Sequence, residues 1–127
     1  MENITLEGST KTPSVQFDAT KGSLAIRGRS IPENSIEFYS PLLDWIDTYG
    51  TNAKNPTVVI IQLEYFNTSS SKCILDIFKR LEKIRSQGNE VLVKWHYEAD
   101  DEDMLEAGED YQAIISLPFE MIEVEEA

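Results

Sequence analysis

The sequence predicts an α/β protein with a single mixed β-sheet flanked by helices. Two short alternating segments separated by a turn signal predict an N-terminal β-hairpin. Further on, an apolar run, an amphipathic helix and a second apolar run predict a central right-handed βαβ unit. The length of 127 residues, with 41% hydrophobic and 27% charged residues, fits one globular domain spanning residues 1–127.

The first part of the chain, from about Ile4 to Arg29, has the pattern of short strands. Residues 15–17 and 24–26 each place a small or polar residue between two apolar ones, as half-buried strands do. Between them, residues 21–23 (Lys-Gly-Ser) are typical of a turn. We therefore expect these two strands to pair as a hairpin.

The first helix has two possible starts. Ser30 with Glu33 and Asn34 with Glu37 both match the capping-box spacing, in which a side chain at each end satisfies a free backbone N–H. The helix should run to about Tyr49, because a glycine follows.

This helix carries two apolar ridges, more than one contact with a sheet requires. We expect one ridge to face the core: Ile36, Tyr39, Leu43 and Ile46. We expect the other to be partly exposed as a partner-binding surface, or to be packed by neighbouring elements: Phe38, Leu42, Trp45 and Tyr49.

The βαβ unit begins with a strand over residues 57–66. Its β-branched run is nearly continuous, which favours a central strand covered on both faces. The following helix should end near residues 87–88, with an apolar stripe of Ile74, Ile77, Phe78, Leu81 and Ile84. Residues 90–97 form the next strand, and the two strands should be parallel.

The last part of the chain predicts a helix and an edge strand. The helix should span residues 100–115, interrupted or shortened at Gly108. Residues 119–124 alternate in polarity as a final strand at the edge of the sheet.

The net charge of −12 is concentrated at one end of the chain. The last 30 residues hold twelve of the 23 acidic residues and none of the 11 Lys and Arg residues. Nucleic acids and anionic membranes are unfavourable partners for such a surface. The simplest interpretation of the acidic segment is a solubilising surface.

Several features of the sequence predict that the protein is located in the cytoplasm. The N-terminal residues lack the basic and apolar regions of a signal peptide. No apolar run approaches the length of a membrane span. The single cysteine, Cys73, excludes an internal disulfide and fits a reducing compartment.

The sequence offers few candidate catalytic residues. The single histidine, His96, lies within a predicted strand, and Cys73 is better explained as a small buried residue. There is no Walker-type phosphate loop and no set of zinc or EF-hand ligands. We therefore expect no catalytic residues, no metal and no cofactor.

The segment 67–71 (Asn-Thr-Ser-Ser-Ser) stands out by its position. It follows a buried parallel strand and opens a helix, where functional groups collect in α/β sheets. A phosphoryl group on a hydroxyl there would meet free backbone N–H groups, with Lys72 nearby. The alternative is structural, because Asn and Ser are also the standard helix N-caps.

Several motifs together resemble the SiaC family of biofilm regulatory phosphoproteins. The resemblance covers roughly residues 10–122 and rests on residues 31–35 (IPENS), 44–46 (DWI), 65–72 (YFNTSSSK), 76–77 (DI) and 93–97 (VKWHY). It implies a fold similar to the STAS domains of anti-sigma-factor antagonists. It also implies that Thr68 is the phosphoacceptor, within an environment of Asn67, Ser69, Ser70 and Lys72. Ser69 is the second candidate, because Ser71 stands where an apolar residue is expected.

The resemblance also implies partners. A protein kinase of the histidine-kinase-like ATPase type would add the phosphate, and a PP2C-type phosphatase would remove it. The unphosphorylated protein would bind and activate a diguanylate cyclase, and so control cyclic-di-GMP. The alternative is an anti-sigma-factor antagonist in a partner-switching pathway, which has transcription as its output.

Overall fold

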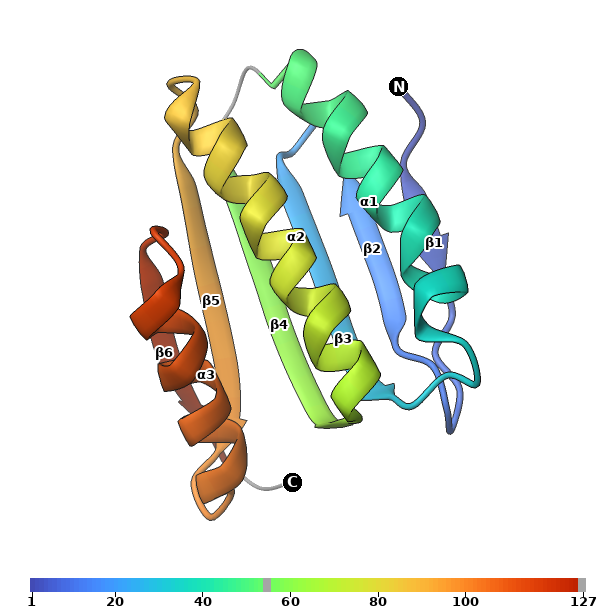
Figure 1. The fold of residues 1–127 in the computed structure, drawn as a ribbon, viewed down its shortest axis with the longest axis vertical. Coiled ribbons are helices and arrows are strands. Elements are labelled where there is room, and N and C mark those ends of the chain that lie inside the picture. Colours follow the sequence, from blue (N-terminus) through green and yellow to red (C-terminus); the bar gives the residue numbers. More distant parts are fainter. Residues whose placement is uncertain (54–55, 126–127) are drawn as a thin grey trace.

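In a computed structural model that describes residues 1–53 and 56–125, three helices pack on one side of a six-stranded sheet (Figure 1). The elements in chain order are β1 (Ile4–Leu6), β2 (Ser14–Asp18), β3 (Ser23–Ser30), α1 (Ser35–Thr51), β4 (Thr57–Phe66), α2 (Thr68–Ser86), β5 (Val91–Glu98), α3 (Glu102–Ile114) and β6 (Phe119–Val124).

The strands lie in the sheet in the order in which they occur in the chain. β1, β2 and β3 pair antiparallel, and β3 to β6 pair parallel. The predicted mixed sheet, the hairpin of β2 and β3, and the parallel pairing of β4 with β5 are therefore confirmed. Gly22 in the hairpin turn has a φ of 66°, and a Cβ there would lie 2.5 Å from the carbonyl oxygen of Pro56. Only glycine fits this turn without strain.

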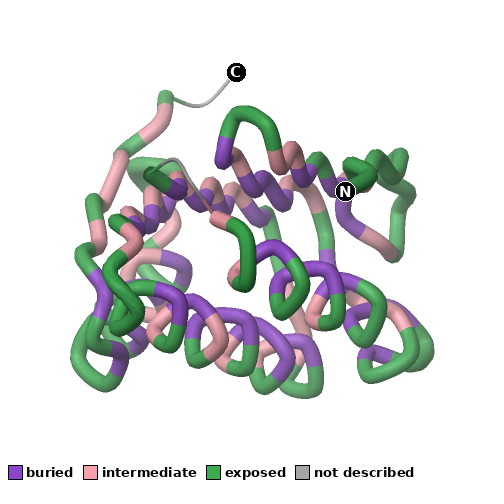
Figure 2. Tube along the Cα trace, turned by 90° about the horizontal axis from the view of Figure 1, so that it is seen from above, coloured by how far each residue is buried: buried purple, intermediate pink, exposed green. Residues whose placement is uncertain are grey.

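The helices cover only one face of the sheet, and Figure 2 shows the strands as a single layer above them. In β4, Val59, Ile61 and Leu63 point into the core and are buried, whereas Val58 and Ile60 on the other face are half-buried. The expectation that this strand is covered on both faces is therefore wrong. Its apolar run suits an uncovered face as well, because the flanking strands of a wide sheet shield the side chains in the middle.

The start of α1 follows the second of the two capping signatures. The Asn34 side chain accepts a hydrogen bond from the backbone N–H of Glu37 at 3.1 Å, whereas Ser30 is the last residue of β3. The helix ends at Thr51, two residues beyond the expected Tyr49. The glycine at position 50 lies within the helix. It allows α1 to approach α2 closely, because a Cβ there would lie 2.6 Å from Ile84.

The assignment of the two ridges of α1 is partly wrong: Tyr39 and Ile46 are buried as expected, and the second ridge is packed by neighbouring elements, which was the other expectation for it. Ile36, expected in the core, is 76% exposed, and Leu43 is half-buried. The ridge expected to be exposed is mostly core: Leu42, Trp45 and Tyr49 are buried and Phe38 is half-buried. These residues therefore do not form the exposed aromatic surface that the sequence suggested.

The physical reason is that α1 packs against two elements at once. It lies over the sheet and has α2 along its flank (Figure 1), so it buries a wider arc than one contact requires. Trp45 stacks on Tyr49 with ring centroids 5.2 Å apart and packs against Phe17 of β2 at 5.1 Å. Its indole N–H donates to the carbonyl oxygen of Glu2 at 2.7 Å, so the N-terminal segment also shields it.

The C-terminal helix α3 is continuous, contrary to the expected interruption at Gly108. Gly108 is buried, and a Cβ there would lie 2.5 Å from Trp95 Cδ1 and 2.5 Å from Met121 Cε. The glycine thus allows α3 to approach β5 and β6 closely. The edge strand β6 spans the predicted residues 119–124.

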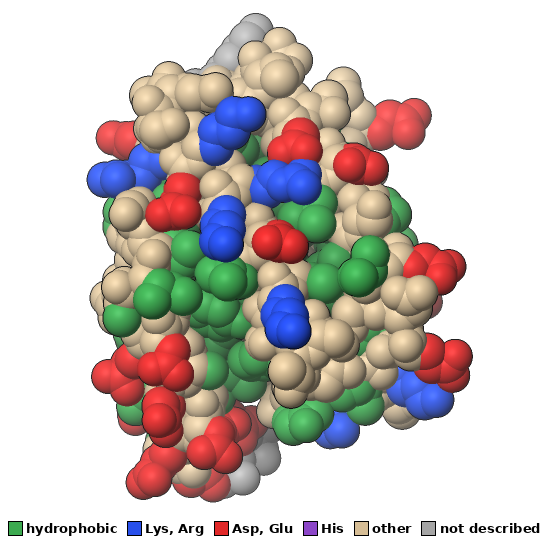
Figure 3. Space-filling view, in the orientation of Figure 1, with side chains coloured by type: hydrophobic (Ala, Val, Ile, Leu, Met, Phe, Trp, Pro, Cys, Tyr) green, Lys and Arg blue, Asp and Glu red, His purple; other side chains and the backbone are tan. Residues whose placement is uncertain are grey.

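Charges on the helical face follow the elements (Figure 3). Acidic side chains gather over α3, and basic side chains lie along α2, which matches the charge asymmetry of the sequence. In the described part of the chain, no helix combines the length and hydropathy needed to cross a bilayer.

Candidate functional site: hydroxyl groups at two helix starts

The N-termini of α1 and α2 lie at the same edge of the sheet, because β3 and β4 are parallel and each leads into a helix (Figure 1). Asn67 caps α2: its side chain accepts from the backbone N–H of Ser70 at 2.9 Å. Thr68 is the first residue of that helix. The predicted strand-to-helix corner is therefore present, and the positive ends of two helix dipoles point toward it.

Beneath this corner lies a buried network of hydroxyl groups. The Ser30 Oγ lies 2.6 Å from the Tyr39 hydroxyl and donates to Ser70 Oγ at 2.9 Å. Ser70 in turn donates to the carbonyl oxygen of Ser30 at 3.0 Å. Burial raises the pKa of Tyr39 to about 12, although the hydrogen bond with Ser30 opposes the shift. The phenol therefore stays protonated at neutral pH, and the network fastens α1 and α2 to the end of β3.

The other two serines of the segment are also engaged. Ser69 Oγ lies 2.7 Å from Ser35 Oγ, in the first turn of α1, and donates to Asn67 Oδ1 at 3.2 Å. Ser71 Oγ donates to the carbonyl oxygen of Thr68 at 2.7 Å. These bonds explain three of the four consecutive hydroxyls as structural.

Thr68 is the exception within the segment. Its side chain is exposed, and its hydroxyl makes no hydrogen bond to any residue of the described ranges 1–53 and 56–125. Lys72 lies one helical turn further along α2 and is also exposed. A negatively charged group on Thr68 would therefore face solvent, free N–H groups at the start of α2, and a lysine in the next turn.

The corner is tied to the C-terminal helix through Tyr111 of α3. Its hydroxyl donates to the carbonyl oxygen of Ser71 at 2.8 Å. Burial raises the pKa of Tyr111 well above its ordinary value, so it remains a donor. Neither Tyr111 nor the partners Ser30, Ser35 and Tyr39 were identified from the sequence as part of this site, since they come from α3, β3 and α1 and no local pattern links these elements to the start of α2.

Two exposed apolar side chains lie on the elements that meet at this corner, and both were also missed. Ile36 adjoins Ser35, whose hydroxyl meets that of Ser69, and is 76% exposed. Tyr65, near the end of β4, is 52% exposed, and the Arg29 guanidinium lies 6.0 Å from its ring centroid. Large apolar groups exposed around a modifiable hydroxyl are typical of a binding surface.

Cys73 lies in the second turn of α2 but does not extend this site. It is buried, and burial raises the pKa of its thiol. A raised pKa disfavours the reactive thiolate. Cys73 thus acts as a small core residue, as the sequence indicated.

The chain is similar to known proteins over nearly its whole length. The model of the SiaC family regulatory phosphoprotein matches residues 6–124. An uncharacterized protein of Pseudomonas aeruginosa strain UCBPP-PA14 is 34% identical over 119 residues, which are 94% of each chain.

Solved structures show the same fold. SiaC of Pseudomonas aeruginosa is 31% identical, with a TM-score of 0.89 over 98% of this chain and 100% of that one. A structure of the diguanylate cyclase SiaD in complex with its activator SiaC, from the same organism, matches at 32% identity and a TM-score of 0.90. That match covers 95% of this chain and 99% of the matched chain.

Proposed function

The chain belongs to the SiaC family of regulatory phosphoproteins, and from this premise we propose that it is a phosphorylation-switched activator of a diguanylate cyclase. Its unphosphorylated form binds the cyclase and raises cyclic-di-GMP. The support for this output is the likeness to SiaC, which in one solved structure is bound to the cyclase SiaD as its activator.

The phosphoacceptor in this proposal is Thr68. The observation that carries it is the exposed, unpartnered hydroxyl of Thr68 beside three serines whose hydroxyls are all hydrogen-bonded. A kinase can reach the Thr68 hydroxyl without breaking any side-chain hydrogen bond of Thr68 in the described structure. Phosphorylating Ser69, the second candidate, would first require loss of its hydrogen bond with Ser35.

The switch acts through charge at a binding surface. A phosphate adds about −1.5 to −2 charge at neutral pH. At a corner that also exposes Ile36, that charge would have to lose water when an apolar partner surface docks. The partner therefore prefers the unphosphorylated form, and the equilibrium shifts by the difference in binding free energy.

Two further proteins belong to this proposal: a protein kinase of the histidine-kinase-like ATPase type and a PP2C-type phosphatase. The chain itself contributes a surface rather than catalysis. Because the kinase needs ATP and the cyclase needs GTP, we place the switch in the cytoplasm.

The proposal is tested by isolating the unmodified protein with its bound partners from its native host and identifying them by mass spectrometry. A diguanylate cyclase whose activity rises on adding the protein supports it. Recovery of an anti-sigma factor in place of a cyclase would instead make the protein an antagonist in a transcription pathway.

Thr68→Ala should fold normally and escape regulation. Because its hydroxyl has no hydrogen-bond partner among the residues that the structure describes, the free energy of unfolding should change by no more than about 0.5 kcal/mol. Incubation with the kinase and ATP should leave the variant unmodified and still able to activate the cyclase. If mass spectrometry found the variant phosphorylated at Ser69, then Ser69 would be the acceptor. If the variant were unfolded, the Thr68 hydroxyl would have a structural role.

Ile36→Ala should weaken cyclase binding about tenfold without loss of stability. The side chain is 76% exposed, so its truncation removes little core packing but does remove an apolar contact beside Thr68. Ile114→Ala is the matched control, since this isoleucine of α3 is 66% exposed and outside the Thr68 corner. Equal affinities of the two variants in a calorimetric titration would exclude Ile36 from the interface.

A further inference from the structure

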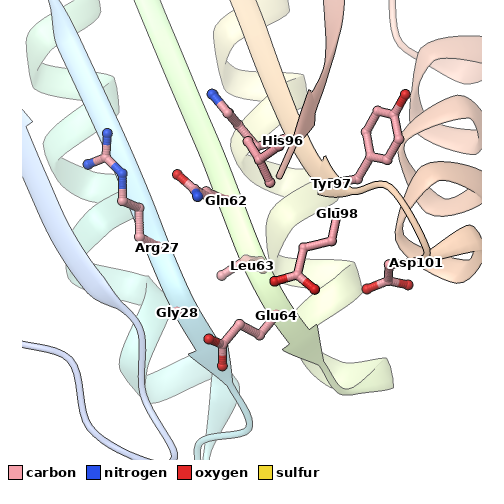
Figure 4. A pocket seen from close by; sticks show the side chains of 10 residues that line it. Arg27, Gly28, Gln62, Leu63, Glu64, His96, Tyr97, Glu98 and Asp101 are labelled. Carbon is pink, nitrogen blue, oxygen red and sulfur yellow. The ribbon is translucent and has the colours of Figure 1, made fainter. Parts of the chain in front are cut away.

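The face of the sheet that no helix covers holds a pocket of about 410 Å³. It lies toward the carboxyl ends of β3, β4 and β5, and Figure 4 shows the side chains that line it. Its volume falls within the range of small-molecule sites. Ligands of open α/β sheets also collect at the carboxyl ends of the strands.

Three polar side chains lie next to one another across the pocket. Arg27 of β3 pairs in register with Gln62 of β4. His96 of β5 occupies the next row position beside Gln62, because each directly follows the paired residues Ile61 and Trp95. With neighbouring strands about 4.8 Å apart, the three form a continuous polar row.

Carboxylates lie at the other end of the pocket. Glu64 occupies the register shift between β3 and β4, where Leu63 and Tyr65 pair with consecutive residues of β3 and Glu64 is left over. This bulge lets the Glu64 side chain line the pocket, together with Glu98 of β5. In Figure 4 the Arg27 guanidinium and these two carboxylates lie at opposite ends of the pocket.

Of the pocket's carboxylates, Asp101 is engaged as the N-cap of α3, where it accepts from the backbone N–H of Met104 at 3.0 Å. The other charged side chains and Gln62 make no side-chain hydrogen bond or ion pair within residues 1–53 and 56–125. The Nδ1 atom of His96 is buried and likewise without a hydrogen-bond partner in the described ranges. Buried polar atoms are nearly always hydrogen-bonded to protein, water or a ligand, so a bound water or ligand would satisfy this nitrogen.

We propose that this pocket binds a small zwitterion, with an anionic group on Arg27 and an ammonium group on Glu64 and Glu98. Gln62 and His96 supply hydrogen bonds between the two charged ends. A metal ion does not fit, because in the described part of the chain no three His, Cys, Asp or Glu side chains gather as metal ligands would. Arg27 and Glu98 stand two strands apart, about 10 Å across the sheet, which suits an extended ω-amino acid or a dipeptide.

The site is separate from the phosphorylation switch. Thr68 begins a helix on the covered face, whereas the pocket opens on the other face. The proposal therefore stands or falls independently of the cyclase and of Thr68.

The test uses 6-aminohexanoate as the zwitterion, with hexanoate and hexylammonium as its single-charge halves. Titration of the full ¹⁵N-labelled chain, followed by NMR, should give saturable shifts with 6-aminohexanoate at the amides around Arg27, Gln62, His96 and Glu98. Each half-molecule should bind at least tenfold more weakly, because it leaves one end of the pocket unpaired. The absence of saturable shifts with 6-aminohexanoate would overturn the proposal.

Charge-removing variants separate this site from general surface binding. Arg27→Gln and Glu98→Gln should each weaken 6-aminohexanoate binding at least tenfold. If either variant loses the dispersed NMR spectrum of a folded protein, Glu64→Gln, at an exposed position, replaces it and should weaken binding to the same extent. Lys83→Gln removes the same positive charge as Arg27→Gln but from α2 on the helical face, and should leave binding unchanged. Equal binding by the Arg27, Glu98 and Lys83 variants would show that no specific pocket is involved.

Discussion

Stoichiometric phosphorylation of Thr68 should weaken binding of the diguanylate cyclase by about 100-fold, equivalent to about 2.7 kcal/mol. A phosphate with a charge of about −1.5 to −2 would stand at the corner that exposes Ile36, and burying it against an apolar partner surface removes its water. The start of α2 and Lys72 stabilise the phosphate in the free protein, which favours the unbound state further.

The measurement is the dissociation constant of the purified cyclase for the phosphorylated and unmodified protein under the same salt conditions. Thr68→Ala exposed to kinase and ATP is the control, since it should bind like the unmodified protein. Thr68→Asp should reproduce only part of the effect, because one carboxylate carries less charge and fewer acceptor oxygens than a phosphate. Affinities within threefold of each other for phosphorylated and unmodified protein would rule out this switch.

Trp95→Ala should remove about 3–5 kcal/mol from the free energy of unfolding. Trp95 is fully buried, its indole N–H donates to the carbonyl oxygen of Met104 at 2.9 Å, and its ring packs 5.5 Å from that of Tyr111. Gly108 of α3 lies directly against the ring. The substitution therefore leaves a cavity and removes the indole hydrogen bond where α3 meets the sheet.

A loss of this size is a large share of the stability of a typical domain, about 5–15 kcal/mol. Urea unfolding followed by circular dichroism measures it, with Ile36→Ala as an exposed control that should change by less than about 0.5 kcal/mol. A loss below about 1.5 kcal/mol for Trp95→Ala would mean that α3 does not depend on this contact.

Much of the fold could be predicted because its signals are local. The strand of residues 57–66, the edge strand of residues 119–124 and the hairpin turn at Gly22 follow from β-branched runs, alternation and glycine, which act within a few residues. The same holds for the corner at Asn67 and Thr68, because an N-cap and the helix start it opens are neighbours in the chain.

The tertiary structure decided which faces these elements bury. Periodicity shows that α1 has two apolar ridges, but only its position beside α2 and over β2 determines that Trp45 is core and Ile36 is exposed. Gly108 likewise looks like a helix breaker in the sequence and is instead a contact point for Trp95.

The sequence by itself determined the mixed sheet, the strand-to-helix corner and the group of hydroxyls at it. The family resemblance already singled out Thr68, but only the tertiary structure gives a physical reason, because Ser69 is bonded to Ser35, and Ser70 to Ser30, across more than 30 residues of chain. The tertiary structure also shows that no helix covers the second face of the sheet, where Arg27 and Glu98 lie at opposite ends of a pocket (Figure 4). Hydrogen bonds and charges that meet across strands depend on register and packing, which no local pattern encodes.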